Sequence, residues 1–139
     1  MTLVDTNVLL DLLSNDPRWS EWSLRQLARR AALGPVIVNE IVYAEMSARM
    51  ESQSQVERAL ADLDASFDRV PTRALFLAGK SYSRYRASGG VRSGVLPDFF
   101  IGAHAQVLGC SLLTRDVRRY RTYFPDVELI APDTTESSP

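Results

Sequence analysis

Residues 2–13 read TLVDTNVLLDLL and give the clearest indication of the fold class. Its first residues form a short apolar run typical of a buried strand, and Asp5 follows that run directly. The stretch after Asp5 is mostly apolar and of helical length, and it stops at the turn residues SNDP of 14–17. We therefore expect a strand over 2–4, a helix over 6–13, and an acidic side chain where the two meet.

Outward from this stretch, the chain alternates short apolar runs with longer helical patterns. Further strands are expected at 36–38, 67–70, 111–114 and 128–131. Helical patterns lie around them, over 18–32, 40–50, 53–66, 71–85, 97–108 and 117–123. Strands separated by helices favour βαβ units, in which a parallel sheet is covered on both faces. The sequence thus predicts a three-layer α/β fold with a central, mainly parallel sheet.

The composition agrees with a single globular domain. The 139 residues are 45% hydrophobic and 24% charged, and this length fits one core. No apolar run reaches the roughly 18 residues of a membrane span, so no membrane contact is expected. The N-terminus lacks a signal peptide's basic segment, and the single cysteine, Cys110, excludes an internal disulfide, so we expect a cytoplasmic protein. We expect the domain over 1–131 and a polar, disordered tail over 132–139.

Four carboxylates are placed to meet at one edge of the expected sheet. Asp5 directly follows the first strand and Asp116 closely follows the strand at 111–114, so both belong to the edge where parallel sheets bind ligands. Glu45 shares a helix face with the apolar residues three and four positions before it, and Asp98 opens a helix in phase with apolar residues. A carboxylate in an apolar stripe is costly to bury unless it is paired or bound to a metal.

Each of these acids also has a purely structural explanation. Asp5 and Asp116 fit helix N-caps. Asp98 fits the positive end of a helix dipole, and Glu45 fits an ion pair with an arginine. Taken together they point to a cation, because converging carboxylates would otherwise raise one another's pKa. Oxygen ligands favour Mg²⁺ or Mn²⁺, and one histidine and one cysteine make a zinc site a poor fit.

Two further acids have less defined roles in the sequence. Glu40 lies five residues before Glu45 and so points to another side of the same helix, where it fits a first-turn position. Asp11 fits either a solvated helix face or an ion pair with an arginine. Neither residue is expected to join the four acids at the sheet edge.

The acids lie in four segments, LVDTNVLLD at 3–11, VNEIVYAE at 38–45, LPDFFIGAHA at 96–105 and LLTRDVRRY at 112–120. Together these segments resemble the four motifs of PIN-domain nucleases and, more narrowly, of VapC-type toxins from bacterial toxin–antitoxin pairs. The resemblance covers the chain to about residue 132 and implies a PIN-like domain that cleaves RNA with Mg²⁺ or Mn²⁺. It also implies a homodimer and neutralisation by a small antitoxin protein. The residues that match the family's catalytic and metal-binding acids are Asp5, Glu45, Asp98 and Asp116.

On this hypothesis the protein is a metal-dependent endoribonuclease in which an activated water attacks the RNA phosphate in line. Thr6, Asn7 and Thr114 flank the acids and are expected to orient them or a phosphate, with local capping as the alternative. The alternative function is a non-catalytic PIN-fold adaptor or RNA-binding protein. Such an adaptor should have lost some of the acids, and this chain keeps all four.

Arginine dominates the basic residues, because only Lys80 among the 16 is a lysine. Arginine binds phosphate in a bidentate manner, so arginines beside the acids or the glycine-rich segment are candidates for contacts with an RNA backbone. A solvated face is the alternative for each of them. The candidates are Arg86, Arg92, Arg115, Arg118 and Arg119.

Several other side chains have two possible roles. Tyr120 fits either stacking on an unpaired base or packing in the protein. Trp19 and Trp22 either complete the core or line a groove for an antitoxin helix. His104 is in phase with the apolar residues of its helix, which favours a packed histidine over a general base.

Overall fold

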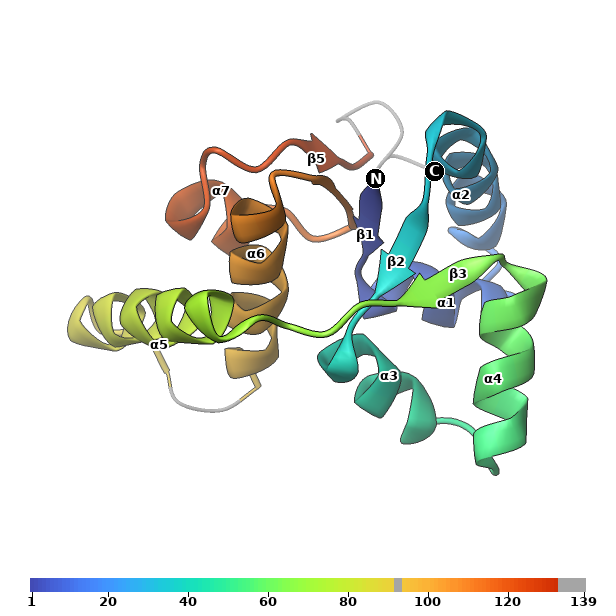
Figure 1. Ribbon diagram of the computed structural model, residues 1–139, viewed down its shortest axis with the longest axis horizontal. Helices are drawn as coiled ribbons and strands as arrows, with labels where there is room; N and C mark the ends of the chain where they lie inside the picture. Colours follow the sequence, from blue (N-terminus) through green and yellow to red (C-terminus); the bar gives the residue numbers. More distant parts are fainter. Residues whose placement is uncertain (92–93, 133–139) are drawn as a thin grey trace.

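The computed structural model describes residues 1–91 and 94–132, in which a five-stranded sheet lies between helices (Figure 1). The strands are β1 (Thr2–Val4), β2 (Val36–Val38), β3 (Ala65–Phe67), β4 (Ser111–Leu113) and β5 (Leu129–Ile130). The helices are α1 (Thr6–Leu13), α2 (Ser20–Leu33), α3 (Glu40–Ser47), α4 (Gln53–Asp62), α5 (Thr72–Ala87), α6 (Leu96–Leu108) and α7 (Arg118–Tyr123). The expected tail, apart from Pro132, lies outside the described residues, as does Arg92.

The strand order is β3-β2-β1-β4-β5, and every neighbouring pair is parallel. Helices α5, α6 and α7 lie on one side of the sheet and α1, α2 and α4 on the other (Figure 1). The prediction of a three-layer α/β fold with a parallel sheet is therefore confirmed. The chain adds β2 and β3 to one side of β1 and then returns to add β4 and β5 to the other. The direction of the strand order thus reverses between β1 and β4, the position where open parallel sheets usually bind ligands.

The three inner strands, β1, β2 and β4, are apolar because helices cover both of their faces. Leu3 pairs with Ile37 on one side and Leu112 on the other, and all three side chains are buried. Such strands read as continuous apolar runs rather than alternating patterns. Among the described residues, no helix has the length and hydropathy needed to cross a membrane.

Local signals set most helix ends as expected. The Asn39 side chain caps α3 by accepting hydrogen bonds from the backbone N–H groups of Ile41 and Val42, at 3.0 and 3.1 Å. Gly109 ends α6 with a positive φ of 67°, a conformation that glycine adopts without strain. These two ends matter for the site, since α3 carries Glu45 and α6 carries Asp98.

Several sequence-based boundaries are wrong. The helix expected to run to residue 66 ends at Asp62, because Asp64 has a positive φ of 54° and turns the chain. The edge strand therefore lies at Ala65–Phe67 instead of 67–70. Helix α2 begins at Ser20 instead of residue 18, because the carboxylate of Asp16 accepts the N–H groups of the preceding turn. Helix α3 ends at Ser47, three residues before its expected end.

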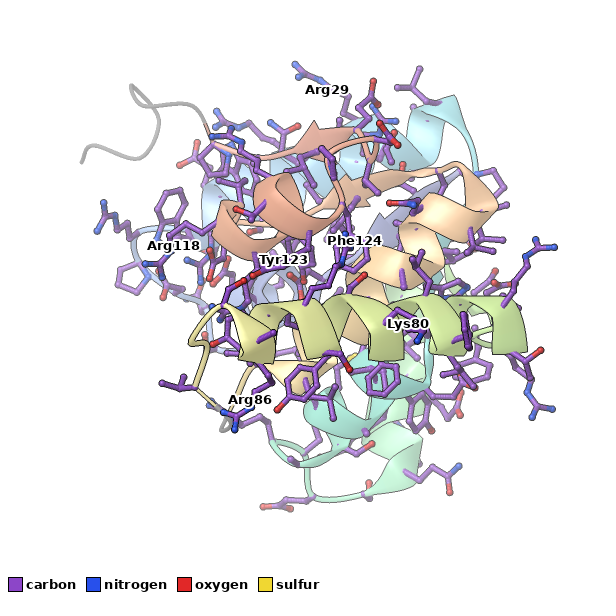
Figure 2. All side chains as sticks on the ribbon, turned by 90° about the vertical axis from the view of Figure 1, so that its left-hand side faces the viewer. Arg29, Lys80, Arg86, Arg118, Tyr123 and Phe124 are labelled. Atoms are coloured by element: carbon purple, nitrogen blue, oxygen red, sulfur yellow. The ribbon has the colours of Figure 1, made fainter. Side chains whose placement is uncertain are left out.

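An aromatic cluster holds α6 against α5 and α7. Phe99 of α6 is fully buried, and its ring centroid lies 5.3–5.5 Å from those of Tyr82, Tyr85 and Tyr123. In Figure 2 Tyr123 and Phe124 lie above α5, on the side of α7. Because Phe99 directly follows Asp98, this packing fixes the part of α6 that carries the acid.

Candidate active site

A pocket of about 350 Å³ lies at the carboxyl edge of the sheet, where the strand order reverses. The four predicted acids line it, and they come from four different parts of the chain. Asp5 follows β1, Asp116 lies three residues after β4, Glu45 is on α3 and Asp98 is in the first turn of α6. The structure thus brings the four acids together, although their role in catalysis remains a prediction.

Asp5 is the most buried of the four acids, with 5% of its surface exposed. Its Oδ1 accepts a hydrogen bond from the Thr6 N–H at 2.7 Å, so Asp5 is also the N-cap of α1. Its Oδ2 accepts from the Thr114 and Tyr120 hydroxyls, both at 2.8 Å. Burial raises the pKa of Asp5 to about 6, and the nearby charge of Asp98 adds to this rise, while the three hydrogen bonds oppose it.

Asp98 is partly buried and paired with a cation. The Arg119 Nε donates to its Oδ2 at 2.9 Å. Burial raises the pKa of Asp98 above its usual value, and the charges of Asp116 and Glu45 act in the same direction. The Arg119 guanidinium opposes the rise without cancelling it. The pocket therefore concentrates negative charge even with this arginine beside it.

Glu45 and Asp116 have fewer hydrogen-bond partners than Asp5. Glu45 Oε1 accepts a hydrogen bond from the Thr6 hydroxyl at 2.7 Å. Asp116 is exposed, and its Oδ1 lies 3.7 Å from the Arg118 Nε. Its N–H donates to the Thr114 hydroxyl at 3.1 Å. Both carboxylates therefore keep oxygen atoms that can accept further ligands.

Thr6, Asn7 and Thr114 connect the acids to one another. Thr6 contacts Asp5 through its backbone N–H and Glu45 through its hydroxyl. Thr114 donates to Asp5 and accepts from the Asn7 side chain at 3.4 Å. Thr6 and Thr114 thus bond directly to the acids, whereas Asn7 bonds to Thr114 and to the Arg115 N–H. The functional role of all three residues stays a prediction.

Asp11 lies outside the pocket and takes part in a buried ion pair. Arg115 donates to both of its carboxylate oxygens, at 2.6 and 2.8 Å, and the Ser23 hydroxyl adds a bond of 2.8 Å. The guanidinium also lies 5.0 Å from the ring centroid of Trp19, and Trp22 is buried beside that ring. Of the two explanations for Asp11, the structure shows the ion pair, and Trp22 completes the core.

Glu40, the other acid of undefined role, also lies outside the pocket. It is in the first turn of α3, and its Oε1 accepts the Val70 N–H at 2.8 Å. It therefore ties α3 to the segment that follows β3.

The arginines proposed to contact RNA differ in whether their guanidinium groups are already paired with a carboxylate. Arg115 forms an ion pair with Asp11, and Arg119 forms one with Asp98. Arg118 is exposed and extends outward, whereas Arg86 lies near the end of α5 and donates to the Gly90 carbonyl at 2.8 Å (Figure 2). Contact with RNA remains a prediction for all of them.

The donor set of the pocket fits a hard divalent cation in type and charge. Four carboxylates line the pocket without any histidine or cysteine, and oxygen donors of this kind suit Mg²⁺ or Mn²⁺. Burial raises the pKa of both Asp5 and Asp98, and the charges of neighbouring acids add to the rise, so a cation in the pocket would favour the ionised carboxylates. Within the described part of the chain, no three acidic, histidine or cysteine side chains stand close enough together to hold an ion as they lie.

The sequence alone did not assign Tyr120 or Arg49 to the site. Tyr120 is 2% exposed and donates to Asp5, so its packing role is confirmed and stacking on a base is excluded. Burial and the charge of Asp5 raise its pKa well above the usual value, so it stays a hydrogen-bond donor. Arg49 also lines the pocket, and its spacing of four residues from Glu45 was the available signal.

The protein is thus an open parallel α/β domain with an acidic pocket where the strand order reverses. A family model of the PIN domain matches residues 2–125, and the chain belongs to this family. No curated protein sequence matches the chain significantly.

Several solved structures share the fold at low sequence identity. VapBC2 from Rickettsia felis, bound to a DNA fragment from its promoter, aligns with a TM-score of 0.71 and 16% identity over 94% of this chain and 97% of that one. VapBC-1 from nontypeable Haemophilus influenzae aligns with a TM-score of 0.69 and 20% sequence identity, over 94% of this chain and 96% of that one. A toxin–antitoxin complex from Klebsiella pneumoniae aligns with a TM-score of 0.64 and 23% sequence identity, over 96% of this chain and 98% of that one. At these identities the likeness shows the fold.

Proposed function

We propose that this protein is a VapC-type toxin of a toxin–antitoxin pair and acts as a metal-dependent endoribonuclease. The observation that carries the proposal is the meeting of four carboxylates, from four separate parts of a PIN domain, in one pocket at the carboxyl edge of the sheet. The similar solved structures support it, since their titles describe VapBC and toxin–antitoxin complexes. We assign the nuclease domain to residues 1–131.

The four acids would hold Mg²⁺ or Mn²⁺, with Asp5 and Asp98 as the most direct ligands. A bound divalent cation supplies activation of a water molecule and neutralisation of phosphate charge. Glu45 would ligate the ion or orient the attacking water, and Asp116 would act through a water. Thr6 and Thr114 keep the carboxylates of Glu45 and Asp5 in place by the hydrogen bonds described above.

The proposed partners follow from the same assignment. RNA is the substrate, a small antitoxin protein is the inhibitor, and the active form is a homodimer in the cytoplasm. The charge of the pocket agrees with the antitoxin proposal, because a cationic side chain from a partner would neutralise carboxylates that otherwise repel one another.

The test is cleavage of total bacterial RNA by the purified chain in Mg²⁺, in Mn²⁺ and in EDTA. We expect discrete fragments with either metal and none with EDTA. Asp98→Asn keeps the shape and partial burial of the side chain and removes its charge, so we expect it to fold and to lose at least about 100-fold in cleavage rate. Asp62→Asn, which changes an exposed acid at the end of α4, is the matched control and should cleave normally.

Two results would contradict the proposal in different ways. Normal cleavage by Asp98→Asn would remove this pocket from the reaction. A folded parent chain that cleaves no RNA under any metal would favour the non-catalytic adaptor instead. Sequencing the fragment ends would identify the target if cleavage occurs.

A further inference from the structure

A second hollow adjoins the acidic pocket, and Arg49 lies between the two. This hollow has a volume of about 240 Å³ and is lined by Leu10, Leu13, Ser14, Arg49 and Met50. Leu10 and Arg49 line the acidic pocket as well. A ligand that extends from the acidic pocket into the hollow therefore contacts Leu10 and Arg49.

Arg49 is exposed, and within the described residues its side chain makes no hydrogen bond or ion pair. This is unexpected for a cation that shares a pocket with four carboxylates. The neighbouring arginines behave differently, since Arg119 pairs with Asp98 and Arg115 with Asp11. Arg49 is thus the cation of the pocket whose donors are all available to a ligand.

We infer that Arg49 and the adjoining hollow form a nucleotide subsite for single-stranded RNA, next to the bond that is cleaved. This inference rests on the proposed nuclease function. The Arg49 guanidinium binds a backbone phosphate beside the acids, where a cation offsets repulsion between the RNA and the carboxylates. Leu10, Leu13 and Met50 provide an apolar surface for the attached base.

Charge complementarity favours RNA as the ligand of this hollow. A phosphate needs a donor that is not already bound to a carboxylate, and Arg49 meets this need where Arg115 and Arg119 do not. The hollow offers one hydroxyl, from Ser14, and that hydroxyl donates to the Leu10 carbonyl at 2.8 Å. The hollow therefore recognises a base by apolar contact, which predicts weak sequence preference at this position.

The test measures binding of a fluorescent, random-sequence, single-stranded RNA oligonucleotide in Mg²⁺, with Asp98→Asn in all proteins to prevent cleavage. We expect Arg49→Gln to bind about tenfold more weakly and to lower the salt dependence by about one unit of log–log slope. Arg49→Lys should keep the slope and recover part of the affinity, because it retains the charge but loses the bidentate geometry. Arg58→Gln is the matched control, since Arg58 is also exposed and its side chain lacks a partner among the described residues.

The apolar half of the subsite is tested separately with Leu13→Asn. Leu13 is 40% exposed at the end of α1, so this change should not unfold the protein. We expect weaker binding with an unchanged salt slope, because no phosphate contact is lost. Unchanged affinity in either Arg49→Gln or Leu13→Asn would overturn the subsite. Failure of the Arg49-containing protein to bind RNA, together with absence of cleavage by the parent, would instead count against the proposed function.

Discussion

Asp5 is both the N-cap of α1 and one of the acids that line the pocket. It caps α1, accepts two hydroxyl groups and faces the pocket, all while 5% exposed. Burial keeps its pKa at about 6, well above that of an unfolded-chain aspartate. The folded protein therefore holds a proton on Asp5 more tightly than the unfolded chain does.

This difference makes stability depend on pH in the absence of metal. A carboxyl whose pKa is raised by folding stabilises the fold below its unfolded pKa of 3.8, and this contribution is lost as the pH rises through about 6. Two pKa units correspond to about 3 kcal/mol, so in EDTA we expect the parent to lose about that much between pH 4 and pH 7.5 from this group. Urea unfolding of the parent and of Asp5→Asn at both pH values isolates the effect.

Asn at position 5 is neutral at both pH values and can still bond to the same hydroxyl groups, because hydroxyls accept as well as donate. We expect it to be more stable than the parent at pH 7.5 in EDTA. An equal change in the free energy of unfolding for both proteins would show that Asp5 does not carry this titration.

At the scale of elements, His104 joins the two helices that supply acids to the pocket. The ring is fully buried in α6, with Nδ1 3.1 Å from the Asn39 Nδ2 and Nε2 2.9 Å from the Asp68 Oδ2. The Asn39 Oδ1 already accepts two backbone N–H groups, so its Nδ2 donates to Nδ1 and the ring donates from Nε2. This contact sets α3, with Glu45, against α6.

We expect His104→Leu to lower the free energy of unfolding by about 2–4 kcal/mol, because it leaves the buried Asn39 amide without its acceptor. His104→Gln should lose less, since its amide can replace one of the two hydrogen bonds. Gln106→Leu, a change of a partly buried residue two positions along the same helix, is the control and should change stability little. Urea denaturation followed by circular dichroism measures all three, and equal stability of His104→Leu and the parent would refute the role of this contact.

At the scale of the whole molecule, the pocket draws on both helical layers and on the sheet. Its acids follow β1 and β4 or lie on α3 and α6, and the pKa of Asp98 is raised by burial and further by the charges of Asp116 and Glu45. Folding therefore works against charge repulsion at this edge. An ion that binds all of these elements should stabilise the entire domain and not one segment.

We expect Mg²⁺ at about ten times its Kd to stabilise the protein by about 1.4 kcal/mol, which raises the melting temperature by roughly 3–5 °C. The effect should be smaller at pH 5, where Asp5 is largely protonated, and smaller in Asp98→Asn. Differential scanning calorimetry with Mg²⁺, and with K⁺ at equal ionic strength, separates specific binding from screening. An identical shift with K⁺ would argue against a metal site.

Local sequence patterns were enough to predict most helices and strands and the place of the acids on them. Periodicity, the Asn39 cap and the Gly109 terminator are local features, because helices and strands form through contacts between residues a few positions apart. Placing Asp5 and Asp116 after strands of a parallel sheet was enough to predict that they share an edge. The local signals failed near Asp64, where an isolated positive φ moved the edge strand.

The pairing of charges, in contrast, depends on how the chain folds in space. Arg115 meets Asp11 across 104 positions of sequence, and Tyr120 reaches Asp5 across 115. No spacing rule connects such residues, since their distance depends on strand order and on the packing of helices over the sheet. Arginines that look equivalent in the sequence therefore become different in the fold, where Arg115 is bound in an ion pair and Arg49 keeps its donors available at the edge of the pocket.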